Sequence, residues 1–464
     1  MSNNIITLQI GQCGNQVGHS FFKALSSQMI QKKTSSTMVG TQSILHEETI
    51  LPFGDGALDC FFRPNTSNPG DPMVARAVLV DMEPKVIQQT LNQTNRRAEG
   101  NLFEYSVDNT FHKQSGSANN WAYGFNFHGP NCADAIMDIV RKEAEHCDGL
   151  SGFMLFQSMA GGTGSGLGCF ISEGLRDEFP HSFICNQVVW PHETGEVIVQ
   201  NYNTLLTLQK LYEVSDGIYI FKNDQLDLTC KRLMGIPSPS FNDMNKVIAD
   251  HLTCLTLPSY HSNNPEQECQ LLFDPIQHLC SHPAYKILNS RIIPHISSKI
   301  KDYSVFRWEG LLKHLHQMLI ADAPIEECIN WRLNATDKRW FSLINRSISN
   351  LMILRGKEIS TIPADSVSPF FNKNIYSSFL HPREAMKVCL NENPAGFNGF
   401  EKTAYLLSNC QSIVSPLEKV ISKAFQMFNA GAYLHPYNKY KVGKEEMEEM
   451  FIRTEQVLFD YKNV

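Results

Sequence analysis

Residues 160–168 read Ala160-Gly-Gly-Thr-Gly-Ser-Gly-Leu-Gly168, and five of the eight residues from Gly161 onward are glycine. It lies between an apolar, strand-like segment at 152–156 and an amphipathic stretch that begins at Leu167. A strand, a glycine turn and a helix start together form an anion site, because backbone N–H groups point outward and the helix N-terminus is partly positive. A flexible glycine linker is the weaker alternative, since linkers are seldom framed so tightly by apolar periodicity.

The glycine run matches neither of the two common phosphate loops. A P-loop ends in Gly-Lys-Ser/Thr, and no lysine lies near 160–168. A dinucleotide fingerprint places its glycines in the first strand–helix turn, whereas this run follows several strand-like segments. The pattern GGTGSGLG instead resembles the phosphate-binding signature of the tubulin superfamily.

A second junction of the same kind lies at the N-terminus. The apolar strand pattern Ile5–Ile10 runs straight into Gly11-Gln-Cys-Gly-Asn-Gln16 and then into a helical pattern that starts at Val17. The hexapeptide GQCGNQ in this position resembles the first nucleotide loop of tubulins. Two such loops in the right order support the same family.

Two carboxylates follow another strand pattern. Residues 76–84 form a strand that ends in Asp81 and Glu83, just before the helix-starting Pro84. Carboxylates at this end of a strand, beside a phosphate site, are suited to holding hydrated magnesium. The alternative for each acid is an ordinary helix N-cap. The sequence therefore predicts that Asp81 and Glu83 bind magnesium through water.

The resemblance implies further contacts to a guanine nucleotide, GTP or GDP. Residues 116–122 resemble the family's GAGNNWA loop and residues 196–203 its ribose loop. The aromatic Phe241 stands where the family stacks a ring on guanine. The predicted nucleotide-binding residues are Gln12, Cys13, Asn119, Ser158, Gly161, Gly162, Thr163, Gly164, Glu196, Gln200, Asn223, Phe241 and Asn245. Thr163 and Ser158 are expected to donate hydroxyl hydrogen bonds to phosphate, and a valine at Gly162 is expected to clash with it.

Strand-like and helical segments alternate through the first half of the chain. Strands are expected at 5–10, 77–81, 152–156, 183–190 and 216–221. This alternation predicts an α/β fold with a parallel sheet covered on both faces and a ligand at the carboxyl ends of its strands. The predicted parts are a GTP-binding α/β domain (1–222), a linking-helix region (223–252), a second α/β domain (253–410) and a C-terminal helical hairpin (411–464).

The second domain and the hairpin have clear local signals. A leucine stripe predicts a helix at 310–320, and residues 350–354 form a strand pattern. Ser415 and Pro416 form an N-cap and first-turn pair for one hairpin helix, and the other follows Gly443.

Composition limits the class of protein. The 464 residues are 42% hydrophobic and 19% charged, with a net charge of −7, which is globular and carries no nucleic-acid footprint. No apolar run of 18 residues predicts a membrane span. The 13 scattered cysteines are typical of reduced thiols in a cytosolic protein. We therefore expect a cytoplasmic protein that binds neither nucleic acid nor membrane.

One loop of the second domain departs from the family. The expected GxxNxDxxE pattern, which completes a neighbour's nucleotide pocket, is replaced by residues 259–274. Asp274 falls where the catalytic acid is expected and could orient water toward a neighbour's γ-phosphate. An ordinary aspartate at a helix start is equally consistent with this position. Because Asp is shorter than Glu and Pro275 stiffens the backbone, only a weak GTPase, completed by a neighbouring subunit, is expected.

Within the superfamily the sequence resembles the delta tubulins most, with the epsilon tubulins second. The passages that carry this are 75–84, 124–130, 188–203 and 308–315. The resemblance implies a GTP-binding structural protein needed for the triplet microtubules of centrioles and basal bodies, and hence for cilia. Its expected partners are alpha/beta-tubulin or other tubulins of the centriole wall. The alternatives are an epsilon-like centrosomal tubulin, a free-standing nucleotide-using enzyme, and a non-polymerising adaptor that binds nucleotide only for stability.

Overall fold

The computed structural model describes most of the chain. The described ranges are 4–29, 31–39, 42–50, 58–65, 72–94, 102–195, 197–261, 264–268, 273–296, 304–378, 380–393 and 396–464. None of the helices in these ranges is both long and apolar enough to cross a bilayer.

The first half is built around a parallel sheet that contains every predicted strand. Its strands lie in the order β8 (Thr110–His112), β6 (Ala77–Asp81), β1 (Asn4–Ile10), β9 (Leu150–Ser158), β10 (Phe183–Trp190) and β11 (Gly217–Lys222). All neighbours in this set are parallel. The chain builds outward from β1 first to one side and then to the other, so the strand order reverses between β1 and β9. Ligands of open parallel sheets bind at the carboxyl ends of the strands beside such a reversal.

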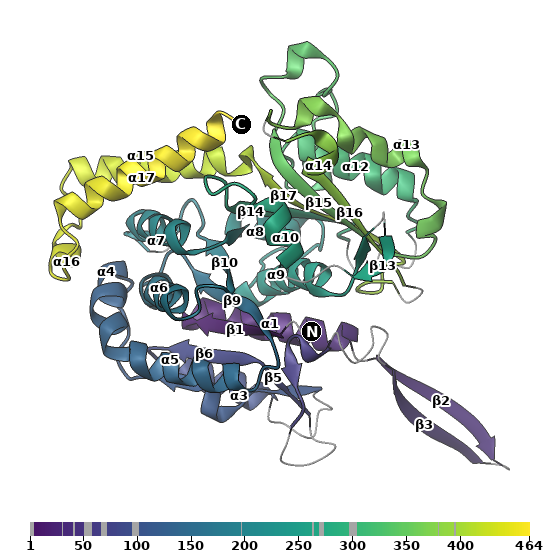
Figure 1. Cartoon of the computed structure of the whole chain (residues 1–464), viewed down its shortest axis with the longest axis horizontal. Helices are drawn as coiled ribbons and strands as arrows, with labels where there is room; N and C mark the ends of the chain where they lie inside the picture. The colour runs from purple at the N-terminus through teal and green to yellow at the C-terminus, as the bar shows by residue number, and fades with distance from the viewer. Residues whose placement is uncertain are drawn as a thin grey trace.

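Helices cover both faces of this sheet (Figure 1). Side chains that alternate along each strand supply both cores: Ile5 packs beneath α1 and α9, whereas Ile6 packs against α5 and α6. The two layers are formed by α1 (Gly11–Met29) and α9 (Phe241–Thr256) on one face, and by α5 (Gly129–Glu145), α6 (Gly168–Glu178) and α7 (Gln200–Val214) on the other. This is the predicted covered parallel sheet.

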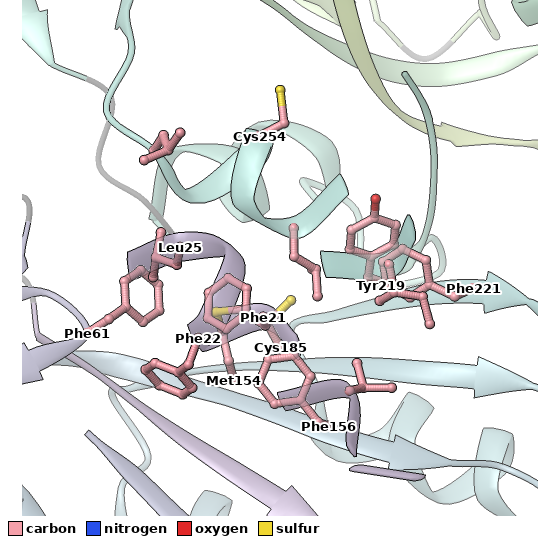
Figure 2. Close-up of a cluster of buried hydrophobic side chains, with 14 of the residues drawn as sticks. Phe21, Phe22, Leu25, Phe61, Met154, Phe156, Cys185, Tyr219, Phe221 and Cys254 are labelled. Atoms are coloured by element: carbon pink, nitrogen blue, oxygen red, sulfur yellow. The ribbon is translucent and has the colours of Figure 1, made fainter. Parts of the chain in front are cut away.

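Aromatic side chains dominate the core beneath α1. Figure 2 shows Phe21 and Phe22 of this helix above Met154 and Phe156 of β9. The ring centroids of Phe21 and Phe156 are 5.6 Å apart, and those of Phe21 and Phe22 are 5.4 Å apart. Buried aromatic rings contribute the largest apolar areas in a core. They hold α1 firmly against the sheet, and with it the loop residues at the start of the helix.

The second half continues the same sheet, which has 12 strands within the described ranges. Two residue pairs join β11 to β14 (Ile287–Ile293) in parallel, and the sheet then becomes mixed. Its remaining strands are β17 (Lys402–Cys410), β15 (Ser347–Gly356), β16 (Met386–Glu392), β12 (Tyr260–His261) and β13 (Asn264–Glu268). The predicted helix and strand lie within α12 (Trp308–Ile320) and β15. The division of the chain at residues 222, 252 and 410 stays a prediction.

The C-terminal segment forms the predicted helical hairpin. Its long helices, α15 (Val414–Asn429) and α17 (Lys444–Lys462), pack on α7. As predicted, α17 begins directly after Gly443. The prediction that Ser415 caps α15 is wrong, because a 3-10 turn at Gln411–Ile413 runs directly into the helix and the N-cap position is Ile413.

A two-stranded hairpin extends from the body of the molecule. It consists of β2 (Gln31–Val39) and β3 (Gln42–Ile50), which pair antiparallel after α1 (Figure 1).

Candidate functional site

A cavity of about 470 Å³ lies at the carboxyl ends of β1 and β9, where the strand order reverses. Among its lining residues are Gln12, Cys13, Asn119, Ser158, Gly161, Gly162, Thr163, Gly164, Gln200, Asn223, Phe241 and Asn245, and also Asp81 and Glu83. The structure therefore brings together every predicted nucleotide and metal residue except Glu196, which lies outside the described residues. These side chains come from loops spread over more than 230 positions of the chain, from Gln12 to Asn245.

The glycines of the loop at 160–168 lie in different surroundings. A Cβ built at Gly161 would meet nothing within 4 Å, so this residue faces open space in the cavity. A Cβ at Gly162 would lie 2.7 Å from Ser117 and 2.8 Å from the backbone nitrogen of Asn120. The expectation that a valine at Gly162 acts by clashing with phosphate is therefore wrong, because the added atoms would first strike the neighbouring loop of the chain itself.

The hydroxyl groups near the loop have partners within the protein. The oxygens of Ser117 and Thr163 lie 2.7 Å apart and share a hydrogen bond. The hydroxyl oxygen of Ser158 accepts a bond from the N–H of Ala160 at 3.2 Å. The Ser158 hydroxyl therefore keeps its hydrogen available for donation, whereas Thr163 can donate to a phosphate only when Ser117 supplies the proton between them.

The loop at 116–120 has an uncommon backbone. Ala118 and Asn119 have φ of 48° and 53°, in the left-handed region that few residues other than glycine adopt. Asn120 then caps α4 (Trp121–Tyr123) by accepting bonds from the N–H groups of Ala122 and Tyr123. Strained backbone of this kind persists where the surroundings hold it, and it is common at binding sites.

Asn203 is the residue that holds these loops together. Its amide nitrogen donates to the carbonyls of Asn119 at 2.8 Å and Ala160 at 2.7 Å. Its amide oxygen accepts from the N–H of Trp121 at 3.1 Å and the hydroxyl of Tyr437 at 2.6 Å. One fully buried side chain thus connects the segments at 116–122 and 160–168 to the C-terminal hairpin. In the sequence Asn203 is only the last residue of the segment that resembles the ribose loop, and nothing there indicates this role, because its four partners are distant in sequence.

The opposite wall of the cavity comes from the two helices after β11. Phe241 and Asn245 are four residues apart on α9 and therefore share one face. Phe241 is 52% exposed although it is a large apolar ring, whereas Asn245 is buried. Asn223 starts α8 (Asn223–Arg232) directly after β11. An exposed ring beside two amides offers a stacking surface and an edge with donors and acceptors, which suits a planar base.

His192 also lines this cavity and was not predicted. Its Nδ1 lies 2.8 Å from a carboxylate oxygen of Asp224, and its carbonyl accepts a bond from the side chain of Gln200 at 2.8 Å. Gln200 thus braces the loop that precedes α7. No motif in the sequence indicated this arrangement.

The two carboxylates differ in environment. Asp81 is buried, and burial raises the pKa of its side chain to about 6. One of its oxygens accepts a weak bond from the N–H of Glu83 at 3.4 Å, and the other has no partner among the described residues. Glu83 is exposed on the same side of the cavity. A buried carboxylate oxygen without a donor fits a hydrated cation better than an N-cap.

The polar character of the cavity comes from neutral groups. Its described lining includes neither lysine nor arginine. Burial raises the pKa of the Cys13 thiol to about 12, so this side chain is a neutral wall and not a nucleophile. Across the described residues, no three His, Cys, Asp or Glu side chains gather as a metal cluster. An anion here would be held by backbone N–H groups, hydroxyls and amides. A cation bound to the carboxylates of Asp81 and Glu83 would add the positive charge.

Asp274 lies away from this cavity. It stands in the first turn of α10 (Phe273–Leu279), is half-buried, and is not among the described lining residues. The structure therefore does not bring it to the chain's own site, and part of the loop before it lies outside the described residues.

Comparison with known proteins agrees with this geometry. Residues 4–231 match the GTPase domain of the Tubulin/FtsZ family, which is a guanine-nucleotide-binding domain. The chain is 40% identical to a tubulin delta chain of Macaca fascicularis and 41% identical to that of Homo sapiens, over 99% of this chain and 100% of each relative. It is also 33% identical to a tubulin beta chain of Pyropia yezoensis, over 54% of this chain and 51% of that protein. Taken with the parallel sheet and its glycine-lined cavity, these similarities show that the chain belongs to the tubulin family.

Proposed function

We propose that the chain is a GTP-binding structural subunit of centriole and basal-body walls, needed there for triplet microtubules and hence for cilia. The observation that carries this proposal is its similarity to tubulin delta chains over almost the whole length. In this proposal its partners are alpha/beta-tubulin or other tubulins of the wall. It resides in the cytoplasm, in the cytoskeleton of the centriole.

The nucleotide in this proposal is GTP or GDP, bound in the large cavity. Gly161 and its neighbours face the phosphates through backbone N–H groups, and Ser158 donates its hydroxyl. Phe241 stacks on the base, while Asn223 and Asn245 bond its edge. Each charge-assisted hydrogen bond of this kind is worth roughly 1.5–3 kcal/mol.

Magnesium completes the proposed phosphate site. Asp81 and Glu83 would hold its water ligands, and the ion would supply the positive charge that the described lining lacks. Support for this comes from the unpartnered, buried oxygen of Asp81.

Replacing Asp81 by Asn should raise the free energy of unfolding of the ligand-free protein. The same change should reduce the additional stability that GTP and magnesium provide. Burial raises the Asp81 pKa to about 6, so the folded carboxyl keeps its proton longer than the unfolded one, and stability falls as pH rises from about 4 to about 6. Above that range Asp81→Asn should add about 2–3 kcal/mol to the free energy of unfolding. Urea unfolding at pH 7 and pH 4, with and without GTP and magnesium, measures this.

The difference should disappear at pH 4, where both side chains are neutral. A variant that is less stable than the original chain at pH 7 without ligand would contradict the burial argument. A variant that keeps full magnesium-dependent stabilisation by GTP would contradict the metal assignment.

Hydrolysis in this proposal is slow and depends on a neighbouring subunit. Because Asp274 is not part of the chain's own cavity, Asp274→Asn should leave GTP affinity of the monomer unchanged. In co-assemblies with alpha/beta-tubulin it should lower the rate of phosphate release from the neighbour's nucleotide by about 100-fold or more, the scale of a positioned acid or base group. Rapid turnover by the isolated monomer, or assemblies unaffected by the change, would refute the role.

Depletion and replacement in a ciliated cell test the biological proposal. Cells without the chain should keep their cytoplasmic microtubules but lose tubules from basal-body walls, and the intact chain should restore them. Normal triplets in its absence would overturn the proposal. Recovery of the walls by a chain that cannot bind GTP would instead favour the adaptor, for which nucleotide is a stabiliser only.

A further inference from the structure

A second, smaller cavity lies where the two halves of the sheet meet. Its volume is about 40 Å³, and it is bounded by β11, β14 and the helices α8 and α9. It is separate from the large cavity, with which it shares no lining residue. The polar residues that line it are Lys222, Gln225, Thr229, His251, Asn289, Ser290, Arg291 and His295.

Arg291 is incompletely paired in this cavity. Its side chain is 3% exposed, and one nitrogen donates to Asp322 at 2.6 Å and to Ser412 at 3.2 Å. The other two nitrogens, Nε and Nη1, are buried without a partner among the described residues. A guanidinium keeps its proton in proteins, so these are permanently charged donors. Leaving them unpaired in the interior is costly.

The charge around the cavity is positive. Lys222 is also buried, and its ammonium donates to the carbonyl of Ser412 at 2.8 Å. Among the ionic contacts of the described residues, Asp322 is the one carboxylate paired with Arg291, and it is 39% exposed. Burial lowers the pKa of His251 and His295 well below the ordinary value, so both rings are neutral at pH 7. Burial lowers the pKa of the Lys222 ammonium, which Asp322 opposes, so the permanent cation Arg291 and this ammonium face one partly solvated acid.

We propose that this cavity is a binding site for one small monovalent anion of halide size, such as chloride. The anion accepts hydrogen bonds from Nε and Nη1 of Arg291, with the ammonium of Lys222 as a second cation. A water molecule needs roughly 10–15 Å³ of such volume, so the cavity has room for a chloride and a water but not for a nucleotide phosphate.

The position of the anion gives it a structural role. Lys222 ends β11 and Arg291 lies on β14, and these two strands pair through only two residue pairs. An anion between the two cations would replace their repulsion by two attractions across this joint. It would therefore stabilise the connection between the nucleotide half and the second half. The site also adjoins the large cavity, because Lys222 directly precedes Asn223, which lines that cavity.

Thermal unfolding of the full chain in different sodium salts tests the proposal. GTP, magnesium and ionic strength are held constant while gluconate, which is too large for the cavity, is replaced by chloride or bromide. We expect the Tm to rise by about 2–5 °C with saturation in chloride and bromide, as for a ligand that binds only the folded state. Arg291→Met should remove this dependence on the anion.

Arg355→Met is the matched control. Arg355 is an equally buried arginine, but its guanidinium donates to backbone carbonyls of Cys254, Leu257 and Pro258 and does not line the small cavity. This variant should lower the Tm in every salt while keeping the difference between gluconate and chloride. The same Tm in all salts for the unaltered chain would overturn the proposal, as would an Arg291→Met protein with the full difference.

A crystallographic measurement covers the case in which Arg291→Met does not fold. Crystals of the unaltered chain grown in bromide should show an anomalous peak within hydrogen-bonding distance of Arg291. Density for water alone at that place, with no anomalous signal, would overturn the anion assignment.

Discussion

Replacing Gly161 by Val should lower the affinity for GTP by about 100-fold or more while leaving the fold intact. A Cβ at Gly161 meets nothing of the protein within 4 Å, and its φ lies outside the left-handed region. The valine therefore adds its bulk only to the cavity, where it would keep phosphate from the backbone N–H groups. Loss of two charge-assisted hydrogen bonds, at roughly 1.5–3 kcal/mol each, gives this magnitude. Fluorescent GTP titration with the purified chain measures it.

Gly310→Val is the matched control, because Gly310 lies in α12 and a Cβ there also meets nothing within 4 Å. It should bind GTP like the unaltered chain. Gly162→Val should lose binding too, but together with stability, since its side chain strikes Ser117 and Asn120 first. Normal GTP affinity in Gly161→Val would show that the phosphates lie elsewhere.

Replacing Arg355 by Met should reduce the free energy of unfolding by about 3–5 kcal/mol, because it removes the donor of buried backbone carbonyls at a cost of roughly 1–3 kcal/mol for each one left unpaired. Arg355 is 1% exposed and donates to Cys254 at 3.0 and 2.9 Å and to Pro258 at 2.7 Å, with a further bond to Leu257. These carbonyls stand at the end of α9, where the helix dipole is negative and orphan acceptors collect. Without the guanidinium the carbonyls of Cys254 and Leu257 lose these donors in a buried place, while that of Pro258 keeps a bond from Asn391 at 3.1 Å.

Urea unfolding with GTP and magnesium present measures this loss. Arg141→Met is the control, since Arg141 pairs on the surface with Asp138 and Glu178 and should leave the urea midpoint unchanged. An Arg355→Met chain as stable as the control would mean that the end of α9 is satisfied in another way.

Local pattern predicted five of the six strands in the parallel sheet of the first half, and it missed β8. Strands β1, β6, β9, β10 and β11 were each expected from apolar runs within two residues of their ends. The turns after them were expected at one edge of the sheet, because parallel strands bring their carboxyl ends together. The predicted nucleotide and metal residues that the structure describes accordingly line one cavity, whereas Asp274 does not. The mixed sheet of the second half was less predictable, since its antiparallel partners are far apart in sequence.

Interactions between distant segments escaped prediction for the same reason. Nothing in the spacing of Asn203 and Tyr437 indicates that their side chains meet at 2.6 Å. The neighbour of Gly162 is another loop, and the small cavity at Arg291 depends on two strands and two helices. The cap of α15 was predicted two residues late, at Ser415 and not at Ile413, because the preceding 3-10 turn leaves no local signal as strong as Ser-Pro.

The main strands of the parallel sheet, the turns that follow them and the family could be predicted from the sequence, because periodicity, glycine turns and helix starts act over a few neighbouring residues. The contacts between these turns became visible only in the folded chain. Burial raises the pKa of Asp81 to about 6, and the chain's own loop, not phosphate, restricts Gly162. The folded structure also places Asp274 outside the chain's own cavity, and it buries the charged side chain of Arg291 in the interior. Burial and contact depend on which remote atoms surround a side chain, and that is settled only when the whole chain packs.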